Sequence, residues 1–459
     1  MGRTILVEDG VQGYVDRLSN TGQWHLGLII GQLTSQRDYG VQLIRTPEPA
    51  EDEVSEEEED EILNTPKRKR RRSSHKPDSL ENIDEQWVAT HAKQVTRMLP
   101  GGLDVIGIFA LAKPQMLTRS QAKLRQILFS IRKIHDKGQI VHDEDAVADR
   151  YLLQICSATR KLTCRTIDVS DPKSTFRPGE WKCQTSPEPW IELRCQITTD
   201  LKITVPLGAQ NHSLLKQILG GLRPYCHTLW NALATVNGEM RPEADSLDQS
   251  SGGRKTRSGK DRGTSQQQCY TISLFSQSTN NKHEVSICDK SARIWLRGQT
   301  HSRAYVPGRS SVGDAVKALK TDVIRSLVSR CELLCEDIEV VDEVKDKNLY
   351  DSPIRVFGQL PGSTVNFCDY MFQDEKIDEV LERIQELLDV TITEDDLQRD
   401  CERVATQDDW PKPKPKPKVE PGADTPVTAM TAVRVYLGAF LGGMAAVLAG
   451  VSYMYMGDS

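Results

Sequence analysis

The sequence contains none of the short motifs by which catalytic or nucleotide-binding loops are usually found. GxSxG, HExxH, GxxxxGK(S/T) and GxGxxG do not occur in its 459 residues. The eleven cysteines form no CxxC pair, and the nine histidines are scattered. In a chain of this length such cysteines indicate free thiols in a reducing compartment rather than disulfides. We therefore expect no catalytic residues, no metal site and no cofactor.

Charge of one sign is not in excess. Lys and Arg number 59 against 65 Asp and Glu, so a nucleic-acid partner is not expected. Hydrophobic residues make up 38% of the chain, which is enough for real cores but too little for a protein that crosses a membrane many times. The first residues, Met1 to Leu6, carry no apolar run typical of a secretory signal, so we expect none.

One long apolar run does occur, at Val433 to Met456, with Arg434 as its single charge. At about 1.5 Å per residue it reaches roughly 36 Å, which is enough to cross a bilayer core of about 30 Å. Its position predicts a single transmembrane tail anchor in the lipid bilayer. Basic residues precede the run, so the positive-inside rule places residues 1–432 in the cytosol. Within the run, Gly438, Gly442, Ala446 and Gly450 have the spacing of a possible helix-pairing face.

Before the anchor, the pattern predicts an α+β body. We expect an N-terminal domain at 1–140 with a disordered charged loop at 48–78, a mixed strand and helix region at 141–239, a linker or loop at 240–268, an α/β region at 269–400 and a Pro/Lys-rich tether at 401–432. Whether 141–400 is one domain or two stays open. The loop holds ten acids between Glu48 and Glu61 and then six bases at Lys67–Arg72. Such a run cannot bury apolar surface.

Residues 1–47 predict strands at Ile5–Val7, Gly13–Val15 and Trp24–Gly31, and at Tyr39–Arg45. Apolar residues at helical spacing predict helices over 79–98, 119–137, 310–334 and 376–389, and a shorter helix over 213–222 that ends at two glycines. Val105–Leu111 and Ile338–Glu343 predict further strands.

The stretch Leu99-Pro-Gly-Gly-Leu-Asp-Val-Ile-Gly-Ile-Phe109 resembles the core strand of the MPN (JAB) fold, the scaffold of zinc-dependent isopeptidases. The resemblance implies two metal-ligating histidines at positions now held by Ala110 and Ala112, and an aspartate at the position of Lys123. Ser120 matches the serine of that pattern. Zinc needs three protein ligands besides its catalytic water, and two alanines and a lysine cannot supply them. A degenerate, non-catalytic MPN-like domain is therefore expected.

Cys226 and His227 place a thiol beside an imidazole, which leaves a cryptic cysteine hydrolase as an alternative. Catalytic Cys/His pairs are usually distant in sequence, so a core cysteine is the preferred interpretation.

The Gly27-Leu-Ile-Ile-Gly31 hairpin, the Leu99–Phe109 stretch and the tail at 433–456 together resemble the family named for the odorant-response-abnormal protein four, a receptor-trafficking protein. The resemblance implies an endoplasmic-reticulum membrane protein with two roles. One is trafficking of a subset of G-protein-coupled receptors. The other is tethering the cysteine protease specific for the ubiquitin-fold modifier, through an MPN-type heterodimer. A receptor chaperone that acts mainly through its transmembrane helix is a further alternative.

Overall fold

The structure is a computed structural model, and it describes residues 2–8, 10–48, 77–141, 143, 146–184, 189–206, 213–248, 267–276, 290–340 and 352–403. All described residues belong to the first of the chain's two units, Met1–Thr406. All four clusters of buried apolar side chains in the described chain lie within the first unit. This unit therefore contains its own hydrophobic core.

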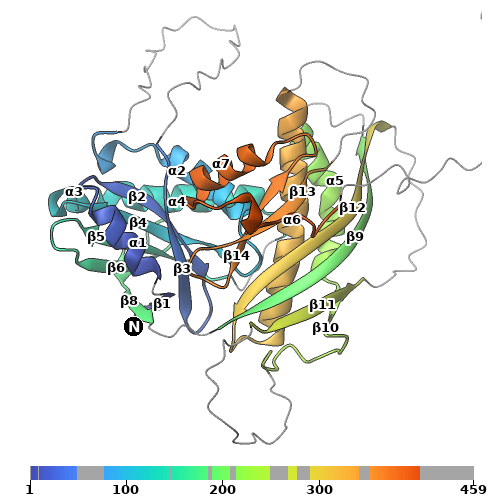
Figure 1. Cartoon of the computed structure of the whole chain (residues 1–459), viewed down its shortest axis with the longest axis horizontal. Helices are drawn as coiled ribbons and strands as arrows, with labels where there is room; N and C mark the ends of the chain where they lie inside the picture. Colours follow the sequence, from blue (N-terminus) through green and yellow to red (C-terminus); the bar gives the residue numbers. More distant parts are fainter. Residues whose placement is uncertain are drawn as a thin grey trace, which may run out of the picture. The chain divides into compact units, whose positions relative to one another are not determined.

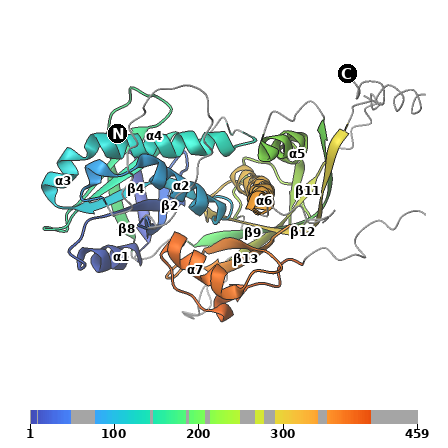
Figure 2. The same ribbon diagram turned by 90° about the horizontal axis from the view of Figure 1, so that it is seen from above.

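The largest sheet has eight strands in the order β7-β6-β5-β4-β2-β3-β1-β8 (Figure 1). These are β1 (Thr4–Glu8), β2 (His25–Gln32), β3 (Asp38–Arg45), β4 (Asp104–Ala112), β5 (Asp149–Cys156), β6 (Leu162–Asp168), β7 (Arg177–Pro178) and β8 (Glu180–Gln184). Its helices are α1 (Gly10–Ser19), α2 (Glu85–Arg97), α3 (Pro114–Arg119) and α4 (Gln121–Gly138), with a 3-10 turn at Leu80–Asn82. In Figure 2, α1 lies on one side of β2 and β4, and α2 and α4 lie on the other.

Both faces of this sheet are covered because its central strands are apolar on both sides. Along β2, Leu28 and Ile30 pack with the side chains of α2 and α4, whereas Ile29 packs with those of α1. All three are fully buried. A strand covered on both faces has a continuous apolar sequence, as β2 and β4 do.

The strand predicted at Gly13–Val15 is wrong, because these residues lie in helix α1. Val11, Tyr14, Val15 and Leu18 are buried along one face, with the spacing of a helix. The glycines at positions 10 and 13 suggested turns between strands, but the apolar stripe determines the local structure.

The boundary predicted between residues 140 and 141 falls inside this fold. β4 pairs in parallel with β5, for example Ala110 with Gln154, so strands on both sides of the boundary belong to one sheet. Of the predicted loop at 48–78, residues 49–76 lie outside the described residues, as do residues 249–266 of the predicted linker.

A second sheet has the order β10-β11-β9-β12. Its strands are β9 (Trp190–Pro206), β10 (Leu233–Val236), β11 (Cys269–Phe275) and β12 (Lys290–Pro307), and its helices are α5 (Leu214–Trp230) and α6 (Val312–Val340). β9 and β12 form a long antiparallel pair, and α6 runs along it (Figure 1). Figure 2 shows α5 and α6 on the same side of this sheet.

Two predicted boundaries in this part are wrong. α5 continues through Gly220 to Trp230, since Leu222, Cys226 and Leu229 extend its buried face. α6 continues to Val340, so the strand predicted from Ile338 begins inside a helix.

A third sheet has the order β14-β13-β15 and carries α7 (Ile377–Leu388). Its strands are β13 (Ile354–Gln359), β14 (Asn366–Met371) and β15 (Leu397–Gln398), with a 3-10 turn at Glu394–Asp396. The predicted helices over 79–98, 119–137, 310–334 and 376–389 are confirmed as α2, α4, α6 and α7, although α2 begins six residues later than predicted and α6 ends six residues later. The α+β class is confirmed.

Among the described residues, no helix combines the length and apolar character needed to cross a membrane. The predicted anchor at Val433–Met456, with its glycine and alanine face at 438, 442, 446 and 450, lies outside the described residues, as does the tether from residue 404 onward.

Candidate functional site

The two alanines at the expected metal-ligand positions are core residues. Ala110 and Ala112 lie on β4 and are 0% and 1% exposed. Both pack in the apolar cluster that α2 and α4 share with the sheet. Ala110 pairs with Leu26 on β2 and with Gln154 on β5, so it is enclosed from both neighbouring strands. Their methyl groups offer no atom that could bind a metal.

At the third expected metal-ligand position, Lys123 forms an ion pair. Lys123 on the first turn of α4 donates to the carboxylate of Glu85 at the start of α2. This hydrogen bond lowers the pKa of Glu85, because it stabilises the charged carboxylate. Ser120, the serine of the expected pattern, is fully buried and its hydroxyl donates to the carbonyl of Met116 at 2.7 Å. Lys123 thus connects α4 to α2, and Ser120 bonds to the last turn of α3.

Nowhere in the described chain do three His, Cys, Asp or Glu side chains gather so that they could hold a metal ion. The polar side chains near β4 are already bonded within the protein. Ser120 donates to a backbone carbonyl, Lys123 is paired with Glu85, and the amide of Gln154 donates to the carbonyl of Leu117 at 3.2 Å. This set does not fit zinc, which prefers thiolate, imidazole and carboxylate ligands.

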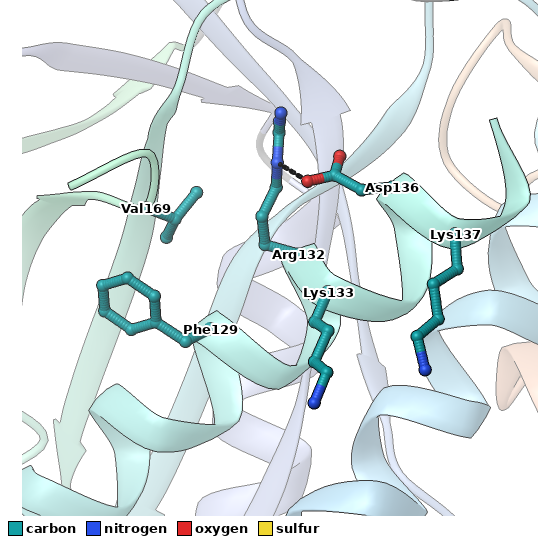
Figure 3. Close-up of a pocket in the computed structure, with 6 residues that line it drawn as sticks. All are labelled: Phe129, Arg132, Lys133, Asp136, Lys137 and Val169. Atoms are coloured by element: carbon teal, nitrogen blue, oxygen red, sulfur yellow. Dashed lines mark hydrogen bonds and ion pairs between the residues drawn. The ribbon is translucent and has the colours of Figure 1, made fainter. Parts of the chain in front are cut away.

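A hollow of about 550 Å³ lies beside α4 (Figure 3). It is lined by Phe129, Arg132, Lys133, Asp136, Lys137 and Val169. Arg132 donates to Asp136 at 2.8 Å, one helical turn away, so the positive charge of this guanidinium is balanced by a carboxylate. Lys133 and Lys137 are exposed and point away from that pair. The one carboxylate among the six lining residues, Asp136, is thus already paired with a guanidinium, and Phe129 and Val169 add apolar side chains.

Cys226 does not meet the requirements of a nucleophile. It is 0% exposed on α5, packed between α5 and α6, and burial raises the pKa of its thiol to about 12. A reactive cysteine needs an accessible thiolate. His227 follows it on the helix and is exposed, so the imidazole and the thiol face different surroundings.

The Pro100-Gly101-Gly102 turn has a role that the sequence did not indicate. The amide of Gly101 donates to the carbonyl of Arg303 at 2.9 Å, and the amide of Tyr305 donates to the carbonyl of Gly101 at 2.9 Å. This turn therefore joins the start of β4 to β12. Only glycine fits there: a Cβ at Gly101 would lie 2.1 Å from the carbonyl oxygen of Ala318, and Gly102 has φ +82°.

Charged side chains support the same junction. Arg325 on α6 donates to the carbonyls of Leu99 and Leu103, at 3.1 Å each. Arg97 at the end of α2 binds Glu332 at 3.1 Å and Glu336 at 2.7 Å, both on α6. Two consecutive glycines were the available signal, since they indicate a close approach of two backbones, but they do not identify the partner segment.

These observations define a mixed α+β protein with three sheets in its described residues, in which the positions expected to bind a metal are filled by core alanines and an ion-paired lysine. The family model described as "ODR4-like: Odorant response abnormal 4-like" matches residues 27–399. The chain belongs to this family.

Curated relatives agree with the assignment. "Protein odr-4 homolog" of Mus musculus is 36% identical over 406 residues, which covers 87% of this chain and 86% of the relative. The homologue of Homo sapiens is 35% identical over 409 residues, with the same coverage. "Odorant response abnormal protein 4" of Caenorhabditis elegans is 22% identical and covers 72% of this chain and 69% of its own.

Among solved structures, "Crystal structure of UfSP from C.elegans" is similar with a TM-score of 0.41 at 8% identity. The similarity covers 85% of this chain and 57% of that chain. A TM-score of this size does not establish a shared fold.

Proposed function

We propose that this protein is a non-enzymatic adaptor, anchored by residues 433–456 in the endoplasmic-reticulum membrane with its body in the cytosol. It tethers and supports the cysteine protease specific for the ubiquitin-fold modifier, and it assists the trafficking of a subset of G-protein-coupled receptors. The observation that carries the non-enzymatic part is the filling of the metal-ligand positions by Ala110, Ala112 and the Lys123–Glu85 ion pair. Membership of a family named for an abnormal odorant response supports the receptor part.

The proposed docking mode is pairing of this chain's N-terminal domain with an MPN-type domain of the protease. A domain that keeps a folded sheet but has lost its metal ligands retains surfaces for pairing while it loses chemistry. The burial of β4 on both faces supports this, because the strand stabilises the domain without contributing to a site.

The first test measures metal binding and cleavage by the fragment 1–406. We expect no stoichiometric zinc binding by calorimetry and no cleavage of an isopeptide-linked ubiquitin-fold modifier. Stoichiometric zinc or measurable cleavage would contradict the non-enzymatic part.

The second test compares partners recovered from membranes in mild detergent with the full chain and with a chain truncated after Met430. Recovery of the protease by both supports the cytosolic body as the docking surface. Loss of every partner on truncation would instead favour a receptor chaperone that acts through the membrane helix. Replacing 433–456 by an unrelated anchor separates the two functions: the adaptor keeps the protease, whereas the chaperone loses its receptors.

A further inference from the structure

The large apolar side chains that are exposed in the described chain all come from one region, around β10 and β11. They are Leu233 at 46%, Met240 at 70% and Phe275 at 54%. Leu233 on β10 is directly opposite Phe275 on β11 in an antiparallel pair, so both side chains lie on the same face of the sheet.

That face is turned away from the core. The neighbouring pair, Ala234 and Leu274, packs against the apolar cluster beneath α6, and the next inward residues, Val236 and Ile272, are buried in it. Since side chains alternate along a strand, the other residues of β10 and β11 point outward. We call these the outer strip: Leu233, Thr235, Cys269, Thr271, Ser273 and Phe275.

The outer strip carries no charged residue. It consists of two large apolar side chains, three hydroxyls and a thiol. The outward positions of the adjoining strand β9 are different, since they include Arg194 and Asp200, both exposed. Arg194 lies directly beside Thr271 in the strand pairing, so only the end of the strip with Leu233 and Phe275 can enter an apolar phase without bringing an ion of β9 with it.

The strip is too small to hold two proteins together by itself. A stable interface buries about 800 Å² on each partner, and two large apolar side chains offer at most about 250 Å² each. A contact of this size is weak when the surfaces meet freely, and it becomes stronger when something else holds them close. The chain provides such a connection, because 29 residues, 404–432, separate the described body from the apolar run at 433–456. At about 3.3 Å per residue they span at most roughly 100 Å.

We propose that the outer strip of β10 and β11, through Leu233 and Phe275, is the surface by which the body contacts the lipid bilayer. Large apolar side chains enter the boundary between headgroups and acyl chains, and the hydroxyls of Thr235 and Ser273 remain at headgroup level. The tether keeps the strip near the membrane. The inference rests on the proposed function in that the membrane anchor keeps the body near the bilayer, but its test uses a fragment without the anchor.

The test uses the fragment 1–406, which contains the complete core, and vesicles of phosphatidylcholine alone. We expect the fragment to sediment with the vesicles to the same extent at low and high salt, since the strip is uncharged. The double variant Leu233→Ser/Phe275→Ser should lose about tenfold or more of this partitioning, because it removes both apolar side chains. The control Leu233→Ile/Phe275→Leu keeps the apolar area and should remain within about twofold of the original fragment.

Three outcomes would overturn the inference: no sedimentation with vesicles at any lipid concentration, binding unchanged in the serine variant, or binding that disappears at high salt. Self-association of the fragment that is lost in the serine variant, without vesicle binding, would assign the strip to a second copy of this chain. Phe275→Ser alone repeats the test with a smaller change to the strands.

The proposed anchor is tested separately, by resistance of the full chain to alkaline extraction from membranes. A full chain that resists extraction together with a fragment that ignores vesicles overturns the inference and leaves the anchor standing. If instead the fragment binds vesicles and the full chain is extracted, the proposed anchor is overturned and the inference about the outer strip stands.

Discussion

Arg355 on β13 and Asp322 on α6 form a two-fold hydrogen-bonded ion pair, at 2.7 and 2.9 Å, in which neither side chain is exposed to solvent. Asp322 also accepts the amide of Arg303 at 3.0 Å. The pair therefore joins three elements, β12, β13 and α6, inside the core.

We expect Arg355→Met to lower the free energy of unfolding by about 3–5 kcal/mol, because it leaves the carboxylate of Asp322 buried without its counter-ion. Urea denaturation of the fragment 1–406 measures the loss. The matched control is Arg399→Met, which breaks an exposed pair with Glu394 at 2.6 Å. That change should cost no more than about 1 kcal/mol. Equal effects of the two variants would show that the buried pair contributes little to stability.

The glycine turn at Gly101 predicts a second difference in stability between two variants. Gly101→Ala places a Cβ 2.1 Å from the carbonyl oxygen of Ala318, so the junction between β4, β12 and α6 must shift. We expect destabilisation of about 1–3 kcal/mol, as for overpacking of a core.

The control for this prediction is Gly220→Ala, on the exposed face of α5, where a Cβ meets nothing within 4 Å. It should be neutral, or stabilising by up to about 1 kcal/mol, because alanine favours a helix over glycine. Hydrogen exchange of the amides of Gly101 and Tyr305 locates the effect. Unchanged exchange in Gly101→Ala would contradict the assignment of this turn as a joint.

Much of the fold follows from sequence periodicity. The helices α2, α4, α6 and α7 carry apolar residues at helical spacing, and the buried run of β4 reads as a strand. Two of the failures have a common cause. α1 and the second half of α5 contain glycine or proline, which are signals for turns, and only packing of Tyr14 or Cys226 against the core overrides them.

The candidate site could also be predicted only in part from the sequence. The sequence shows which ligands are missing at positions 110, 112 and 123, because identity alone decides that question. It does not show that Lys123 pairs with Glu85, 38 residues earlier, or that Gly101 contacts Arg303. Contacts across such separations depend on the arrangement of the sheets, which no local pattern encodes.

His91 predicts an acid-sensitive step in stability. It is 2% exposed on α2, its Nε2 lies 2.9 Å from the carbonyl oxygen of Leu387, and its Nδ1 has no hydrogen-bond partner. Burial lowers its pKa from 6.5 to about 4. The folded state then binds fewer protons than the unfolded state between these values, so stability is lost as the pH falls from 6.5 toward 4. The loss amounts to about 3 kcal/mol at about 1.4 kcal/mol per pH unit.

Urea denaturation of the fragment 1–406 across this pH range, with and without His91→Leu, measures the effect. The variant should lose this part of the pH dependence. His227→Gln, which changes an exposed histidine, should retain it. A pH profile that is the same in His91→Leu as in the original fragment would mean that other groups cause the acid sensitivity.

The thiols predict a pattern of chemical labelling that bears on the hydrolase alternative. Cys183 and Cys269 are exposed, whereas Cys226 and Cys331 are wholly buried between α5 and α6, where burial raises the pKa of each thiol to about 12. Because alkylation proceeds through an accessible thiolate, iodoacetamide should modify the two exposed cysteines at least about a hundredfold faster than the buried pair. Peptide mass spectrometry of the native fragment 1–406 after timed quenching gives the rate at each site. Denatured fragment is the control, since all four should then react at similar rates. Rapid and selective modification of Cys226 in the native fragment would restore the cysteine-hydrolase interpretation and contradict the adaptor proposed above.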